Sequence, residues 1–507
     1  MLTFDFDNTY ARELAGFYAA WKPAPAPAPR LMYFNSELAA ELGLPAELPA
    51  PSELAQLFAG NRLPDGAEPL AQAYAGHQFG GFSPRLGDGR ALLLGEVIDR
   101  SGRRRDIAFK GSGRTPFSRG GDGKAAVGPM LREVIIGEAM HALGIPTTRA
   151  LAVAATGEHV MRELPLPGAV LTRVAASHLR VGTFQYFVAR GEIDKLRQLL
   201  EYAIARHDPA LAGAPDRVFG FFRAVAARQA ALIAQWMNVG FIHGVMNTDN
   251  MTISGETIDY GPCAFMEAMN PGAVFSSIDH GGRYAYANQP HVARWNLAKL
   301  AEALLPLVAD GDDKASVDRA VAEATAVIDA FPGQFAAALL TGQRAKLGLT
   351  NATPADDATD SALVEDWLAL LERERVDFTL AWRRLADAAG GSDAPLRMLV
   401  ADGDALAAWL IRWRARCAAD DAASGMAVGE ASPARAERMR KVNPFVIPRN
   451  HRVEEALSAA SDNDDLGPFE NLLAAVRRPF EETPDLATYG EPAPLAVTAG
   501  YQTFCGT

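Results

Sequence analysis

The sequence predicts an α+β protein of two lobes, a β-rich lobe followed by a mostly helical one, with extra segments at both ends. Between residues 90 and 174, short apolar or alternating runs are separated by Gly-rich loops, which is typical of strands. From about Phe184 onward, apolar residues recur at helical spacing over long runs. We therefore expect an N-terminal extension over residues 1–75, a β-rich lobe over 76–180 and a helical lobe over 181–507 that ends in a C-terminal extension.

Composition excludes several classes of protein. The 507 residues carry a formal net charge of −12, which argues against nucleic-acid binding and against a polybasic membrane patch. Three cysteines are too few for a disulfide framework or a zinc site, and the first residues lack the basic and apolar regions of a signal peptide. No apolar run approaches the length of a membrane span. We expect a cytoplasmic protein that binds neither nucleic acid nor membrane.

The elements expected in the first 180 residues follow from local patterns. Residues 22–30 form a stiff proline-alanine segment, 36–42 a short helix and 72–81 a loop. Strands are expected over 91–98, 105–110, 151–155, 159–162 and 169–174, with a Gly-rich loop over 111–128. A helix over 129–143 begins at Pro129 and is ended by Gly144.

The second lobe is expected to consist of helices. Their apolar patterns cover residues 193–206, 218–239, 292–309, 316–330, 335–346, 362–388, 405–419, 449–459 and 469–476. Pro332-Gly333 is the expected break between the fourth and the fifth of these helices.

A polar stretch after the helix over 218–239 has the layout of a protein-kinase active site. His243 begins a short loop that ends in Asp249-Asn250, a β-like segment over 251–258 follows, and Asp259 begins a D-Y-G motif. Kinases place H-R-D-x-x-x-x-N and then D-F-G in this order, and the Asn and the second Asp hold Mg²⁺. Asn250 and Asp259 match these two metal ligands. A polar loop after a helix is the alternative interpretation.

One kinase residue is missing from this stretch. Val245 stands where the Asp of H-R-D would accept a proton. Asp249 could accept a hydroxyl proton in its place, or it could cap a turn. His243 is expected to be structural and bonded to the backbone.

A nucleotide triphosphate also needs positive charge near its phosphates. Lys110 ends the alternating strand, and the next helix carries Glu133 and Glu138, which point to different faces and could each pair with it. Arg173 and Arg180 lie where the chain passes between the lobes and could each bind a phosphate through two hydrogen bonds. A solvated lysine and surface salt bridges are the alternatives.

Two glycine-rich turns could bring the backbone close to a nucleotide. Gly87-Asp88-Gly89-Arg90 leads into a strand, although a simple hairpin turn gives the same pattern and Asp88 would repel a γ-phosphate. Residues 120–124 fail the Walker A pattern, but they could still form a backbone nest for an anion.

Several long motifs resemble the selenoprotein O family over nearly the whole chain. They are F-K-G-S-G-R-T-P-F-S-R at 109–119, L-G-I-P-T-T-R-A at 143–150, H-G-V-M-N-T-D-N-M at 243–251, I-D-Y-G-P at 258–262, F-D-F-D-N at 4–8, Y-A-G-H-Q-F-G at 74–80 and N-P-x-x-I-P-R-N at 443–450. The resemblance implies a protein-kinase-like fold that binds ATP in a flipped orientation. It also implies an adenylyltransferase that moves AMP onto Ser, Thr or Tyr hydroxyls of proteins, which can include the chain itself.

The resemblance further implies a role for each site residue. Gly87, Gly89, Arg90, Asp122 and Gly123 contact the nucleotide, Lys110 binds phosphates and pairs with Glu133, and Arg173 and Arg180 clamp the nucleotide. Asp249 is the proton acceptor, and Asn250 and Asp259 hold Mg²⁺ or Mn²⁺, with Asp259 also close to the ATP.

Two other functions stay open at this point. Ordinary phosphoryl transfer is disfavoured by Val245 and Asp88, and a nucleotide-binding pseudokinase scaffold is disfavoured by the intact Lys110, Asn250 and Asp259.

Cys505 stands close to the position where some members of the family carry selenocysteine. A disulfide to Cys263, four residues beyond Asp259, would tether the tail across the active site. Members with such a bridge place the partner further along the chain than Cys263. A free reactive thiol and an exposed thiol on the tail are the alternatives.

Overall fold

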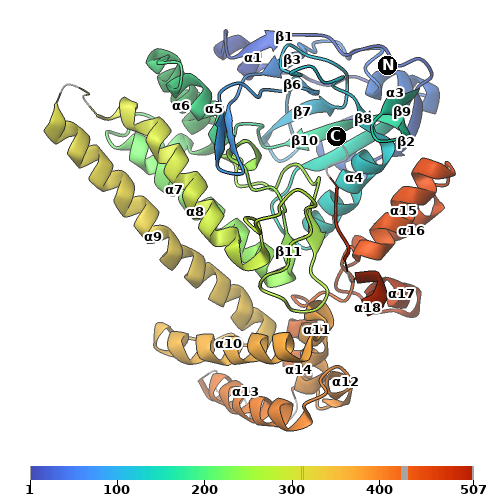
Figure 1. Cartoon of the computed structure of the whole chain (residues 1–507), viewed down its shortest axis with the longest axis vertical. Coiled ribbons are helices and arrows are strands. Elements are labelled where there is room, and N and C mark those ends of the chain that lie inside the picture. The colour runs from blue at the N-terminus through green and yellow to red at the C-terminus, as the bar shows by residue number, and fades with distance from the viewer. Residues whose placement is uncertain (1, 310, 312, 424–431, 499, 505–507) are drawn as a thin grey trace.

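A computed structural model of the chain describes residues 2–309, 311, 313–423, 432–498 and 500–504 (Figure 1). Its elements form an α+β fold, with an antiparallel sheet built from the first 175 residues and helices that dominate the rest of the chain. The fold class predicted from the sequence is confirmed to this extent. The division into two lobes at about residue 180 stays a prediction.

The main sheet has eight strands in the order β1-β3-β6-β7-β10-β9-β2, with β8 paired to β10. The strands are β1 (Tyr18–Ala20), β2 (Arg30–Phe34), β3 (Leu70–Gln72), β6 (Ala91–Ile98), β7 (Arg104–Lys110), β8 (Ala125–Ala126), β9 (Arg149–Met161) and β10 (Pro165–Ala175). The segment over 1–75 therefore contributes three strands and lies at both edges of the sheet. The strands expected over 151–155 and 159–162 are one long strand, β9.

Two strand pairs and one segment with isolated bridges lie outside this sheet. Residues 72–81, expected to be a loop, contain most of a hairpin of β4 (Gly76–Gln78) and β5 (Gly81–Ser83). A second two-stranded pair joins β11 (Phe241–Ile242) to β12 (Ala264–Phe265). The β-like segment expected over 251–258 forms only isolated bridges, at Thr252 and Thr257.

Helix α4 (Val127–Ala142) packs against β9 and β10 and closes one face of the sheet. The remaining helices are α1 (Thr9–Glu13), α2 (Ser36–Glu41), α3 (Pro51–Phe58), α5 (Val181–Val188), α6 (Ile193–His207), α7 (Arg217–Val239), α8 (Gln289–Leu304), α9 (Lys314–Leu347), α10 (Asp357–Glu374), α11 (Phe378–Ala389), α12 (Ala394–Arg397), α13 (Gly403–Ala423), α14 (Pro433–Arg440), α15 (Asn450–Asp462), α16 (Gly467–Val476), α17 (Ala487–Gly490) and α18 (Leu495–Thr498). Short 3₁₀ turns occur at Pro209–Leu211, Thr248–Asn250, Tyr286–Asn288, Leu305–Leu307, Pro354–Asp356 and Pro484–Leu486.

The break expected at Pro332-Gly333 was wrong, because α9 continues through it. A proline inside a helix leaves the carbonyl four residues earlier without its N–H partner. Here that carbonyl belongs to Ile328, and it accepts a hydrogen bond of 3.2 Å from Nε of Arg294 on α8. The neighbouring helix thus supplies the donor that the proline removes.

Helix α9 also departs from the expectation about apolar runs. It contains an 18-residue window with a mean hydropathy of 1.2, which is long and apolar enough for a membrane span by length and composition alone. In the structure α9 lies along α7 and α8 (Figure 1).

The single helix expected over 362–388 was wrong as well, because it is divided into α10 and α11. Arg375 adopts a left-handed conformation with φ 53°, and Asp377 then caps α11 by accepting a 2.7 Å bond from the N–H of Leu380. Asp377 also pairs with Arg449, a fully buried residue that contacts Glu267 too. The break between α10 and α11 therefore brings the carboxylate of Asp377 into contact with the buried guanidinium of Arg449.

We expect Arg449→Leu to lower the stability of the fold by about 3–5 kcal/mol, because it leaves the carboxylates of Glu267 and Asp377 buried without their cation. Urea unfolding followed by tryptophan fluorescence measures the change. Arg412→Leu is the control, because Arg412 forms an ion pair with Asp366 in which both side chains are about half exposed, and it should cost less than about 1 kcal/mol. Equal losses in the two variants would contradict the prediction.

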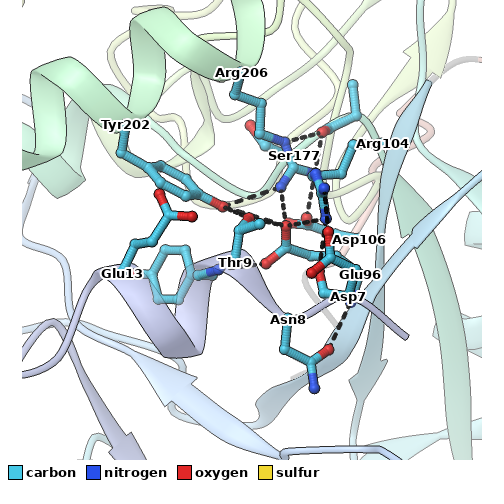
Figure 2. A network of polar contacts seen from close by, with 12 residues as sticks. Asp7, Asn8, Thr9, Glu13, Glu96, Arg104, Asp106, Ser177, Tyr202 and Arg206 are labelled. Carbon is cyan, nitrogen blue, oxygen red and sulfur yellow. Dashed lines mark hydrogen bonds and ion pairs between the residues drawn. The ribbon is translucent and has the colours of Figure 1, made fainter. Parts of the chain in front are cut away.

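A buried polar network fixes the sheet relative to the N-terminal segment and α6 (Figure 2). Arg206 of α6 donates to Glu96 of β6 at 2.7 Å and also pairs with Asp106 of β7. Thr9 donates to the same carboxylate of Glu96, and Arg104 bonds the backbone of Asp7 at 2.6 Å. Segments from three parts of the chain thus meet beside β7, the strand that ends in Lys110.

Candidate active site

A cavity of about 520 Å³ lies between the sheet, α4 and the segment over 245–262. All of the residues expected to form the nucleotide and metal site line it. They are Gly87, Gly89, Arg90, Lys110, Asp122, Gly123, Glu133, Arg173, Arg180, Asp249, Asn250 and Asp259. They come from the glycine-rich turns, β7, α4, β10, the N-terminal end of α5 and the loop after β11, so the fold brings residues more than 170 positions apart into one site.

Asp259 is surrounded by cations. Its Oδ1 contacts Nζ of Lys110 and accepts a 2.8 Å bond from Arg173, whereas Oδ2 has no hydrogen-bond partner in the described part of the chain. Burial alone would raise the pKa of Asp259, but the positive charges of Lys110, Arg173 and Arg180 outweigh it and hold the pKa well below its usual value. Asp259 is therefore anionic at neutral pH, with one oxygen free to bind a cation.

Lys110 resolves the choice between the two glutamates on α4. Its Nζ contacts the carboxylate of Glu133, and both side chains are buried. Glu138 instead pairs with Arg149, whose Nε lies 2.6 Å from Oε1. Glu133 is thus the residue that positions the lysine.

The two carboxylate oxygens of Asp249 differ in their hydrogen bonding. Oδ2 accepts a 3.1 Å bond from Nε2 of Gln78, and Oδ1 is buried without a hydrogen-bond partner among the described residues. Burial raises the pKa of Asp249 to about 6. A carboxylate that lines a cavity and has a raised pKa has the properties of a proton acceptor at neutral pH.

Asn250 and Asp259 are suited to a hard divalent cation. Nδ2 of Asn250 donates to the carbonyl of Val245 at 3.0 Å, which leaves Oδ1 without a bond to any described residue. Together with Oδ2 of Asp259 it offers two oxygen donors on one cavity, and Mg²⁺ is usually bound by one or two such protein groups together with substrate phosphates. Among the described residues no cluster of three or more His, Cys, Asp or Glu could hold a metal by itself.

Two arginines that line the cavity have N–H groups without a hydrogen-bond partner among the described residues. Nη1 of Arg90 and Nη2 of Arg180 are buried with no partner in the part of the chain that the structure describes. Arg180 is held over the ring of Tyr74 at 4.3 Å, and it also donates to the backbone oxygen of Asp249 at 3.3 Å. Buried donors without partners are costly, so this wall of the cavity favours an anion.

The glycine-rich turns are explained in part by their own packing. A Cβ on Gly87, at φ 68°, would lie 2.4 Å from the ring of Phe117, and one on Gly123, at φ 69°, would lie 2.2 Å from the carbonyl oxygen of Gly113. The carboxylate of Asp122 is already paired with Arg162 at 2.9 and 3.2 Å. Gly87 and Gly123 are therefore required by the turns themselves, whatever the cavity holds.

His243 is structural, as predicted. Its Nδ1 accepts from the N–H of Val245 at 3.3 Å, so Nε2 carries the proton and donates to the carbonyl of Ile258 at 2.9 Å. Both ring nitrogens are used by the backbone, and burial lowers the pKa of His243.

Two residues that contact the site were not predicted from the sequence. Gln78 holds Asp249, and His178 accepts a 3.2 Å bond from Nε of Arg173 while its Nδ1 lies 2.9 Å from Asp106. His178 therefore connects Arg173 to the network of Figure 2. Gln78 lies 171 residues from Asp249, and Asp106, which holds His178 in place, lies 72 residues from it, so no local pattern indicates these two contacts.

The C-terminal tail reaches the cavity. Thr503 donates to the carbonyl of Pro262 at 2.7 Å and pairs with Ser276, and Phe504 lines the cavity. Cys505 lies outside the described residues, so its disulfide stays a prediction. Cys263 is buried as a free thiol, and burial raises its pKa to about 12.

Comparison with known proteins gives consistent matches over the whole chain. Residues 1–477 match the family described as "Protein adenylyltransferase SelO". The chain is 59% identical to "Protein nucleotidyltransferase YdiU" of Cereibacter sphaeroides over 507 residues, which is all of both chains. It is 59% identical to the protein of the same name from Chromobacterium violaceum, over 97% of this chain and 99% of the relative, and 56% identical to that of Rhizobium etli, over 99% and 97%.

Proposed function

The chain belongs to the SelO family of protein adenylyltransferases, and from that premise we propose how its own residues perform the transfer. AMP from ATP is joined to a Ser, Thr or Tyr hydroxyl of an acceptor protein, and pyrophosphate leaves. The observation that carries the proposal is the cavity, which is lined by the carboxylate residue Asp249 together with Asn250, Asp259, Arg90 and Arg180.

The proposed binding roles follow from charge. Oδ1 of Asn250 and Oδ2 of Asp259 would hold Mg²⁺ or Mn²⁺, which when bound neutralises charge on the phosphates. Lys110, fixed by Glu133, and Arg173, fixed by His178, set the orientation of Asp259. Arg90 and Arg180 bind phosphate oxygens through their free N–H groups.

The proposed proton acceptor is Asp249. The acceptor hydroxyl loses its proton to the carboxylate of Asp249 as its oxygen attacks the α-phosphorus, and the bond to the bridging oxygen of pyrophosphate breaks. Gln78 keeps one carboxylate oxygen in place during the transfer. Val245 cannot take this proton, so Asp249 replaces the missing kinase residue.

Incubation with ATP labelled separately at the α- and γ-phosphates tests the function. Retention of the α label on protein is the expected result. Retention of the γ label would mean phosphoryl transfer, and binding of ATP without retention of either label would mean a nucleotide-binding scaffold. Either of these results would refute the proposal.

We expect the rate of transfer at limiting acceptor to rise between pH 5 and pH 7, with a midpoint near the Asp249 pKa of about 6. The sign follows from the role of the base, because Asp249 accepts a proton only in its ionised form and this form disappears as the pH falls through the pKa. The dependence of kcat/KM on pH, measured at saturating ATP and metal, checks this. A rate that is flat from pH 5 to 7 would contradict it.

A further inference from the structure

The hairpin β4–β5 is held against the loop that carries Asp249, beside α5 (Figure 1). Three consecutive residues of the hairpin bond three consecutive residues of the loop. The N–H of His77 donates to Thr248 at 2.7 Å, the side chain of Gln78 to Asp249 at 3.1 Å, and the N–H of Phe79 to Asn247 at 3.2 Å. The tip of the hairpin is therefore fixed next to the proposed proton acceptor.

The tip carries an exposed aromatic ring where the backbone favours glycine. Phe79 has φ 51° and Gly80 has φ 87°, a turn in which both residues are left-handed and in which Asn-Gly is preferred. A bulky residue in this conformation costs about 1–2 kcal/mol, yet the side chain of Phe79 is 40% exposed. Strain of this kind is concentrated at functional sites.

The aromatic surface continues from the hairpin onto α8. The ring of His77 lies 4.8 Å from that of Phe82, which is 44% exposed, and 5.2 Å from that of Trp295 on α8. The guanidinium of Arg283 lies 4.8 Å from the centre of the Trp295 ring. Arg283 has no carboxylate partner among the described residues, and its Nε is buried without a hydrogen bond.

We propose that Phe79, Phe82, Trp295 and Arg283 form the docking surface for the acceptor polypeptide. The surface selects segments that carry an apolar side chain and a carboxylate near the modified hydroxyl. This inference rests on the proposed function, because it assigns the surface to the acceptor of that same reaction. Gln78 and Phe79 line the cavity together with Asp249, so a polypeptide on the surface places its hydroxyl at the proton acceptor.

The chemistry of the surface matches this occupant. Aromatic residues and arginine are the residue types that contribute most to binding at protein interfaces. An acidic group on the polypeptide would supply the partner that Arg283 lacks. The cations proposed to act on the nucleotide, Lys110, Arg90 and Arg180, are not part of the docking surface, which meets the same cavity at Phe79.

The test uses the full-length protein and a library of synthetic peptides around one Ser, in which each flanking position carries Phe or Ala and, separately, Glu or Lys. Peptides with Phe and Glu should have the highest kcat/KM. Phe79→Gly and Phe82→Ala should each lower kcat/KM for these peptides by about 10-fold, as truncating an aromatic anchor does. The loss should appear in KM for the peptide, with KM for ATP unchanged.

Phe79→Gly separates binding from folding, because glycine adopts the turn conformation without strain and removes only the ring. Ile411→Ala is the matched control, since Ile411 on α13 is an exposed apolar residue that does not line the cavity. Arg283→Gln should remove the preference for Glu over Lys while leaving the preference for Phe. Full retention of both preferences in these variants would overturn the docking surface.

The outcomes separate this inference from the function on which it rests. If the wild-type protein transfers no α label to any protein or peptide, the proposed function fails. If it transfers label and Phe79→Gly and Phe82→Ala match it on every peptide, only the docking surface fails. Loss of self-modification alone, with peptides unaffected, would mean that the surface binds a second copy of the chain and would also overturn the inference.

Discussion

Asp259→Ala is expected to lower AMP transfer by at least about 10³-fold. Asp259 is the anionic member of the proposed metal site, and a bound metal contributes several kcal/mol of charge stabilisation to a transferring phosphoryl group. The same substitution removes the carboxylate that Lys110 and Arg173 share. Incorporation of α label, measured with Mg²⁺ and again with Mn²⁺, checks the prediction.

Asp360→Asn is the control for loss of a buried aspartate between two cations. Asp360 is fully buried and pairs with Arg344 and Arg416, as Asp259 pairs with Lys110 and Arg173, but it lies away from the cavity. Asp360→Asn should destabilise the fold and leave transfer per folded molecule unchanged. Transfer by Asp259→Ala at the wild-type rate would refute the metal site.

The elements best predicted from sequence were those with a strong local pattern. The strand over 91–98 was predicted with both of its ends, and Lys110 was placed at the end of its strand. In each case the alternation or the apolar run is longer than the error with which the end of a strand can be predicted. The position of Glu133 on a helix followed from the same kind of pattern, but its pairing with Lys110 did not.

The failures share one physical cause, which is a partner distant in the sequence. Pro332 does not break α9 because Arg294 of another helix satisfies the carbonyl of Ile328. The left-handed conformation of Arg375 interrupts an apolar helical pattern, and it accompanies the contact between Asp377 and Arg449. Residues 72–81 were expected to be a loop, but the hairpin over 76–83 is held by its own strand pairing and by hydrogen bonds to residues 247–249, which no local pattern shows.

Asp249→Asn is expected to slow transfer by roughly 10²–10⁴-fold while it leaves ATP affinity within about threefold of wild type. The two effects separate because the carboxylate of Asp249 bonds Gln78 and not Lys110 or Arg173. Arg180 bonds the backbone oxygen of Asp249, which the substitution keeps. Asparagine has the shape of aspartate and can still accept the bond from Gln78, so the loop and the hairpin keep their positions. What is lost is the oxygen that takes the proton.

The measurements are the single-turnover rate of bound ATP and, separately, the dissociation constant of ATP with metal. The residual activity of Asp249→Asn should also lose its rise through pH 6, because the group that titrates there is gone. A collapse of ATP affinity with normal turnover of the ATP that does bind would make Asp249 a ligand and leave the reaction without a base. A pH profile that keeps its midpoint near 6 would assign the titration to another group on the cavity. In either case the carboxylate of Asp249 would not be the proton acceptor.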